Sequence, residues 1–150
     1  MKRLVCIVSL LALLLSACSI DEQIPSIPEG NYDYDIYQLT FKEKILSNDF
    51  VGNFWSFTYT HNGQVIKSGY KIAQSLEIFT FQSIGVEIRE HDKIDDVATG
   101  TLAVAICDGG SGKTKVTVTE TNGRFKGNTA VWEITCEVKL VDEKGPSQNA

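Results

Sequence analysis

The stretch from Cys107 to Thr114, Cys-Asp-Gly-Gly-Ser-Gly-Lys-Thr, contains glycines, a lysine and a hydroxyl in the order that phosphate-binding loops use. Such a loop needs glycine at its first position and a helix after it, because the N-terminus of that helix faces the phosphates. Here the first position is Cys107, and the residues from Lys115 to Thr119 alternate like a strand. We therefore expect a Gly/Ser-rich strand connection and no bound nucleotide.

Carboxylates and an imidazole gather at Glu90-His91-Asp92 and Asp95-Asp96. A hard cation needs six or more converging oxygens, and a zinc site needs nitrogen or sulfur ligands at defined spacings. Neither pattern is present, so the sequence predicts a solvated loop, with no metal and no cofactor.

The sequence contains few candidate residues for nucleophilic catalysis. No serine lies in a motif such as Gly-x-Ser-x-Gly, and His61 lies beside an expected hairpin turn. Paired acids for glycoside chemistry could come together in a fold, but no pair stands out from the sequence. We expect no catalytic residues and no enzymatic activity.

The N-terminus begins with Lys2 and Arg3, and an apolar run follows from Leu4 to Leu15. A basic start and a short apolar segment are typical of a secretory signal peptide, because a membrane-spanning helix needs about 20 residues. The run ends in Leu-Ser-Ala-Cys18, which resembles the lipobox of bacterial lipoproteins. That resemblance implies cleavage after residue 17 and acylation of Cys18, so the lipid would attach the protein to a membrane. The alternative is an ordinary signal peptide that ends near a cysteine.

Ser19 follows the cysteine. An aspartate at this position resembles an inner-membrane retention signal of many Gram-negative bacteria, and it is absent here. We therefore expect a lipid-anchored protein of the outer membrane in the cell envelope. Whether it is on the periplasmic face or the cell surface stays open.

Four cysteines occur in the chain. Cys6 would leave with the signal peptide and Cys18 would carry the lipid. Cys107 and Cys136 remain, and an even pair in an exported chain predicts a disulfide. Closing a loop of roughly 30 residues would stabilise the fold by about 3–4 kcal/mol. The alternatives are two free thiols or half of a metal site. Strict strand alternation places the two on opposite faces, so a bridge needs a bulge after Cys107 or a covered second face.

The chain is acidic, with 14 basic and 19 acidic residues and a formal net charge of −5. Removing the signal peptide takes away two basic residues and no acidic one, so the mature charge becomes −7. An acidic surface argues against nucleic acid as a partner, because phosphate binding needs a clustered basic face.

Alternation of apolar and polar residues dominates from Tyr37 onward and predicts strands. Asn62-Gly63 is a strong hairpin signal, and a further turn is expected at Ser83–Gly85. One short helix is expected, from Lys42 to Phe50. The alternating runs are Tyr37–Lys42, Trp55–Tyr59, Gln64–Ala73, Leu76–Gln82, Val86–Glu90, Leu102–Ile106, Val116–Val118 and Trp132–Leu140.

These runs predict an all-β domain of about eight antiparallel strands, either a meandering barrel or a β-sandwich. The expected organisation is a signal peptide (1–17), a lipidated N-terminus and tether (18–35), a single β domain (36–142) and a polar tail (143–150).

Several aromatic residues fall on the same strand faces and could line a ligand cavity or fill a packed core. The residues we single out as ligand contacts are Trp55, Tyr70 and Phe81.

The segment from Phe50 to Trp55, Phe-Val-Gly-Asn-Phe-Trp, resembles the start of small bacterial lipocalin-like lipoproteins, which often carry Gly-x-Trp here. Asn62-Gly63, Phe79-Thr80-Phe81 and Gly85 match the hairpin, strand and turn that follow in that family. One extra residue separates Gly52 from Trp55. The resemblance implies a meandering barrel with a small apolar ligand and no catalytic residues.

Two hypotheses follow. In the first, the protein is a lipid-anchored barrel that binds a small hydrophobic or amphipathic ligand. In the second, it is an anchored sandwich that contacts or inhibits another envelope or secreted protein. A connected apolar cavity would favour the first, and a filled core with an exposed aromatic patch would favour the second.

Overall fold

The computed structural model describes residues 34–75 and 80–144, and these residues form eight strands and no helix. None of the described residues belongs to a helix that could span a membrane. The strands are β1 (Tyr34–Asn48), β2 (Trp55–His61), β3 (Gln64–Ile66), β4 (Lys71–Ser75), β5 (Phe81–Glu90), β6 (Asp96–Ala105), β7 (Ser111–Thr119) and β8 (Thr129–Lys144).

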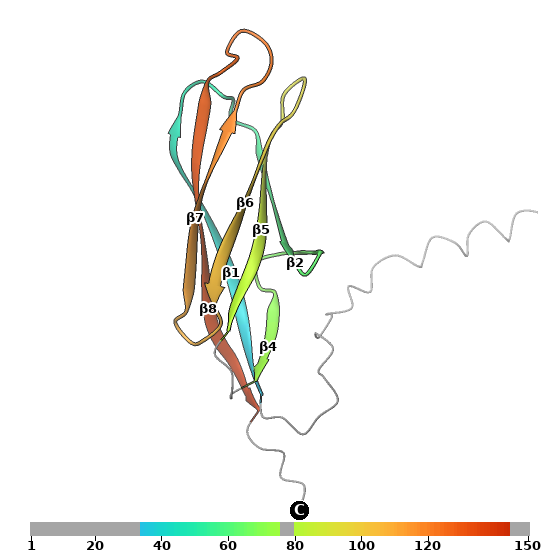
Figure 1. Ribbon diagram of the computed structural model, residues 1–150, viewed down its shortest axis with the longest axis vertical. Coiled ribbons are helices and arrows are strands. Elements are labelled where there is room, and N and C mark those ends of the chain that lie inside the picture. Colours follow the sequence, from blue (N-terminus) through green and yellow to red (C-terminus); the bar gives the residue numbers. More distant parts are fainter. Residues whose placement is uncertain (1–33, 76–79, 145–150) are drawn as a thin grey trace, which may run out of the picture.

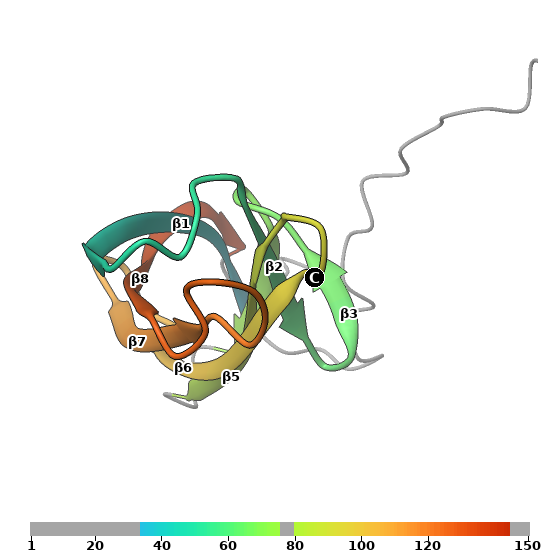
Figure 2. The ribbon, with the colours of Figure 1, turned by 90° about the horizontal axis from the view of Figure 1, so that it is seen from above.

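The strands form two antiparallel four-stranded sheets, ordered β4-β1-β8-β7 and β3-β2-β5-β6. The prediction of an all-β fold of eight antiparallel strands is confirmed. The strand order differs from a simple meander, because β1 pairs with both β4 and β8. Viewed from above, the two sheets curl toward each other around a common core (Figure 2).

The core is built from alternate residues of the long strands, as the period of two requires. On β1 the buried side chains are Tyr37, Leu39 and Phe41, and β5 contributes a second buried series. The other members are Val51, Tyr59, Ile66, Ile72, Ile84, Val86, Ile88, Leu102, Val104, Ile106, Val116, Val118, Ala130, Ile134, Cys136 and Val138.

Three expected elements are wrong. The segment from Lys42 to Phe50 is not a helix, because β1 continues to Asn48 in register with β8. The turn expected at Ser83–Gly85 is absent, since β5 is continuous there. The run Gln64–Ala73 is divided between β3 and β4, which belong to different sheets.

The connection from β6 to β7 brings the edges of the two sheets together. A Cβ atom on Gly110 would collide with the carbonyl oxygen of Ala105, and one on Gly112 would collide with that of Ala103. The glycines that resemble a phosphate-binding loop therefore allow two strands to approach closely, and a strand follows them rather than a helix.

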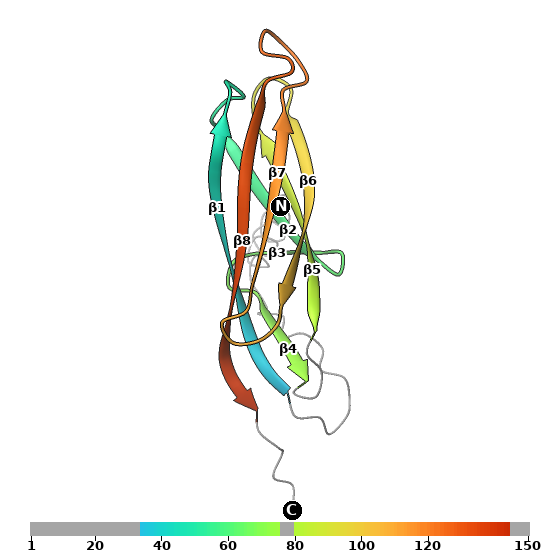
Figure 3. The same cartoon turned by 60° about the vertical axis from the view of Figure 1, so that its left-hand side comes forward.

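The domain is elongated, and its two ends differ. The loops after β1, β5 and β7 meet at one end, which is uppermost in Figures 1 and 3. At the other end, β1 begins beside the end of β8, where Tyr34 pairs with Lys144. At about 3.3 Å per residue, the 15 residues of β1 separate these ends by about 45 Å.

Candidate functional site

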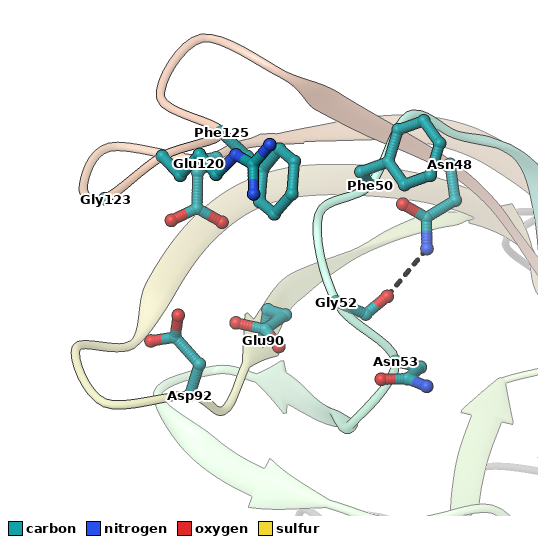
Figure 4. A pocket seen from close by; sticks show the side chains of 10 residues that line it. Asn48, Phe50, Gly52, Asn53, Glu90, Asp92, Glu120, Gly123 and Phe125 are labelled. Carbon is teal, nitrogen blue, oxygen red and sulfur yellow. Dashed lines mark hydrogen bonds between the residues drawn. The ribbon is translucent and has the colours of Figure 1, made fainter.

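The three loops at the upper end enclose an open cleft of about 680 Å³. Its walls combine carboxylates with phenylalanine rings, and their side chains face one another in Figure 4. The cleft is lined by Asn48, Phe50, Gly52, Asn53, Glu90, Asp92, Glu120, Gly123, Arg124 and Phe125.

Glu90, the last residue of β5, is the most deeply placed of these carboxylates. Its side chain is 98 % buried, and its Oε2 atom has no hydrogen-bond partner among the described residues. The carboxylate lies against Gly52, where a Cβ atom would collide with it. Gly52 also has a φ of +84°, which favours glycine. The glycine therefore makes room for a buried carboxylate at the cleft.

Asp96, the first residue of β6, holds the loop after β7. Its Oδ1 atom accepts hydrogen bonds from the backbone N–H of Thr121, at 2.9 Å, and from the hydroxyl of Thr121. Asp96 is 1 % exposed, and its Oδ2 atom has no partner among the described residues. This anchoring positions Glu120, the neighbour of Thr121, at the cleft.

Two carboxyl groups at the cleft, those of Glu90 and Glu120, have raised pKa values. The pKa of Glu90 is raised first by burial and then by the charges of Asp92, Glu120 and Asp96, while His91 lowers it. The pKa of Glu120 is raised by burial and by Asp96 and Asp92. Burial is therefore the largest cause of both pKa shifts, and the neighbouring negative charges add to it.

The loop after β1 is held by Asn48. Its Oδ1 atom accepts a hydrogen bond from Val51 N–H at 2.9 Å, and its Nδ2 donates to Gly52 O at 2.7 Å. Between them, Phe50 has a φ of 55° and exposes 74 % of its surface, while Val51 is fully buried. The loop thus uses one apolar residue as an anchor and presents the other at the cleft.

Aromatic side chains form the upper wall. Phe50 stacks on Phe125, with ring centroids 6.0 Å apart and an angle of 18° between the planes. The guanidinium of Arg124 lies 5.7 Å from the centre of the Phe125 ring. Among the described residues, no ion pair joins Arg124 to a cleft carboxylate. The one cation that lines the cleft therefore rests on an aromatic ring.

A metal ion does not fit the arrangement of the acids. Within residues 34–75 and 80–144, no three His, Cys, Asp or Glu side chains could hold one ion together. The prediction of a solvated loop at residues 90–96 is nevertheless wrong for Glu90 and Asp96, which are both buried.

A serine, a histidine and an aspartate meet outside the cleft, a grouping that sequence motifs did not indicate. Ser56 Oγ lies 2.7 Å from His91 Nε2, and His91 Nδ1 lies 3.4 Å from Asp95 Oδ2. That Asp95 oxygen also binds Arg89 at 3.1 Å. Ser56 pairs with Arg89 in the β2–β5 ladder. The geometry is that of a surface hydrogen-bond chain.

The three residues predicted to contact an apolar ligand do not come together. Trp55 pairs with Glu90 at one end of β5, and Phe81 is nine residues away at the other end, about 30 Å along the strand. Trp55 packs against Trp132, with centroids 5.3 Å apart. Tyr70 lies beside His61 in the turn before β4, and Phe81 is 67 % exposed.

The predicted bridge between Cys107 and Cys136 is absent from the structure, in which both are free thiols. The two cysteines lie at different positions along β8. The turn that begins at Cys107 lies beside Val138, through the hydrogen bond from Val138 N to Gly110 O, whereas Cys136 pairs with Gly112. Burial raises the pKa of the Cys136 thiol to about 12. Cys18 and the rest of the expected leader and tether, up to residue 33, lie outside the described residues.

No protein-family model, curated protein or solved structure matches this chain.

Proposed function

We propose that this chain is a non-catalytic binding protein of the bacterial cell envelope, anchored in the outer membrane by a lipid on Cys18. Its domain presents the end cleft to another protein. The observation that carries this proposal is the gathering of exposed aromatic side chains around the cleft. Exposed apolar patches of this kind mark interaction sites.

The rim of the cleft supports a protein as the partner. Phe50 and Phe125 are 74 % and 44 % exposed, and Phe54, in the loop from β1 to β2, is 69 % exposed. Aromatic residues that stay exposed in the free protein are those that contribute most when an interface buries them.

The position of the cleft supports the anchored arrangement. The described chain begins at the end opposite the cleft, about 45 Å away along β1. A lipid on Cys18 would attach at that opposite end through the tether. The cleft would then point away from the membrane and toward a partner.

The alternative, a small apolar ligand inside a barrel, is less well supported. Trp55, Tyr70 and Phe81 are separated, and the sheets are filled by their own side chains. The cleft is open and carries carboxylates, which would be desolvated by an apolar ligand at a cost in free energy.

Photo-crosslinking in the producing bacterium tests the proposal. A photoreactive phenylalanine analogue replaces Phe125 in one strain and Phe81, an exposed phenylalanine of the opposite end, in another. We expect a discrete protein adduct at position 125 and none at position 81. The same adducts from both positions would contradict the proposal. So would the absence of an adduct at position 125 if native mass spectrometry shows a retained small molecule.

A further inference from the structure

Among the described residues that line the cleft, negatively charged side chains outnumber positively charged ones. Glu90, Asp92 and Glu120 all line it, and their carboxylates point into one space in Figure 4. Arg124 is the one cation among the lining residues, and its guanidinium lies over Phe125 instead.

An unpartnered oxygen on a buried acid points to a ligand independently of this charge. Glu90 is 98 % buried, and its Oε2 has no hydrogen-bond donor among the described residues. Buried polar atoms are nearly always paired, so the unpaired carboxylate oxygen of a residue that lines the cleft points to a donor that the described residues do not supply.

The size and lining of the cleft indicate which kind of hydrogen-bond donor it would bind. No three acidic side chains of the described strands and loops could share a metal ion, and about 680 Å³ is far larger than a bare ion needs. The stacked rings of Phe50 and Phe125 form the opposite wall. Carboxylates facing aromatic rings suit an organic cation, because the ring faces attract positive charge and the carboxylates accept its hydrogen bonds.

We propose that the cleft binds the ammonium or guanidinium group of a lysine or arginine side chain flanked by apolar residues. Glu90 would accept the hydrogen bond, Glu120 and Asp92 would contribute charge, and Phe50 and Phe125 would cover the apolar stem. The partner protein would supply this lysine or arginine, so the source of the side chain rests on the proposed function.

The test uses the full-length protein extracted from its host in a non-ionic detergent. Saturation-transfer NMR compares benzylammonium with benzyl alcohol, which has the same ring and no charge. The variants are Glu90→Gln and Glu120→Gln, with Glu137→Gln as the matched control. Glu137 is an exposed acid of β8 that pairs with Lys42 and lies outside the cleft.

We expect saturable binding of benzylammonium and none of benzyl alcohol. Binding should weaken about tenfold or more in each cleft variant and stay unchanged in Glu137→Gln. Equal binding of both probes, or unchanged binding in both cleft variants, would overturn the inference. Glutamine has nearly the same shape as glutamate, so we expect both cleft variants to fold, and a thermal melt of each variant verifies this. If Glu90→Gln does not fold, the binding measurement on Glu120→Gln decides the test.

The source is tested by competition. A short peptide with lysine between two phenylalanines should displace benzylammonium, and its Nε-acetylated form should not. Failure of the free-lysine peptide to displace the probe would overturn the side-chain source and assign the site to a small amine. The crosslink at position 125 is measured separately, so loss of cation binding with a retained crosslink rejects this inference and leaves the proposed function standing.

Discussion

Glu90 can bury its carboxylate at the cleft because Gly52 has no side chain in the same space. Changing Gly52 to Ala should therefore lower the free energy of unfolding by more than backbone strain alone would. A left-handed φ costs an alanine about 1–2 kcal/mol, and crowding adds about 1–3 kcal/mol. Denaturant unfolding measures the sum. Gly63→Ala is the control, since Gly63 has a φ of +78° and open space around it.

A double variant separates the two causes. Adding Glu90→Ala to Gly52→Ala removes the carboxylate that the new methyl group would meet, so the crowding part of the loss should be recovered while the strain remains. Equal losses for Gly52→Ala and Gly63→Ala would show that Glu90 does not press on this loop.

The raised pKa values of Glu90 and Glu120 predict how stability depends on pH. Between its unfolded and folded pKa, each carboxyl binds more protons in the folded state, so the free energy of unfolding falls as the pH rises through this window. The protein should melt at a higher temperature near pH 5 than near pH 7.5. Asp92 and Asp96 act on both groups, and His91 acts on Glu90.

The double variant Glu90→Gln/Glu120→Gln should flatten this dependence, because the amides bind no protons. Melting curves from pH 4.5 to 8 measure it, with Glu137→Gln as the control. An unchanged slope in the double variant would mean that other groups cause the dependence.

The two thiols should react differently. Cys136 is fully buried with a pKa of about 12, whereas Cys107 is partly exposed. We expect iodoacetamide to modify Cys107 in the folded protein and both cysteines after unfolding without reductant. Intact mass spectrometry counts the additions. A mass lower by two hydrogens, with neither thiol modified after unfolding, would instead establish the predicted disulfide.

At the scale of residues, the sequence predicted a cluster of acidic side chains but not that two of them are buried. Glu90, Asp92 and Asp96 stood out as a cluster, yet their burial depends on loops that are distant in sequence. Gly52 comes from the loop after β1, and Thr121 from the loop after β7. A local pattern carries no information about such partners.

At the scale of elements, the close approach of β6 and β7 rests on glycine. Gly112→Ala places a methyl group against the carbonyl of Ala103, which is backbone and cannot rotate away. We expect a loss of about 1–3 kcal/mol in the free energy of unfolding. Gly109→Ala, in the preceding turn, has open space around it but a φ of +72°, so its loss measures backbone strain without crowding. A loss below about 1 kcal/mol for Gly112→Ala would contradict the close approach.

Strand prediction succeeded where alternation was long, as in Tyr37–Phe41, and failed where a local preference competed with pairing. The segment Lys42–Phe50 has good helix formers, but from Lys42 to Asn48 it pairs with Thr135–Ala130 of β8. A continuous ladder with a long partner outweighs a weak local propensity. In the same way, Gly85 suggested a turn but lies inside β5, opposite Thr60, whose side chain occupies the space of a Cβ atom.

At the scale of the molecule, the cleft and the start of the described chain lie about 45 Å apart along β1, and the proposed function uses this distance to separate membrane attachment from partner binding. An elongated β domain keeps its loops clear of the surface at its other end. This division predicts that attachment can be removed without loss of the cleft, since the eight described strands pair with one another.

Changing Cys18 to Ala tests that division. Without an acylated cysteine the proposed lipid anchor is lost, and a formal net charge of −5 does not attract the chain to anionic lipids in its place. In membrane fractionation of the producing bacterium, we expect Cys18→Ala to leave the outer-membrane fraction, whereas Cys6→Ala, in the same leader, should stay there. The photo-crosslink at position 125 should still form if the partner is soluble. Continued extraction of Cys18→Ala by detergent alone would reject the lipobox and, with it, the orientation of the cleft away from the membrane.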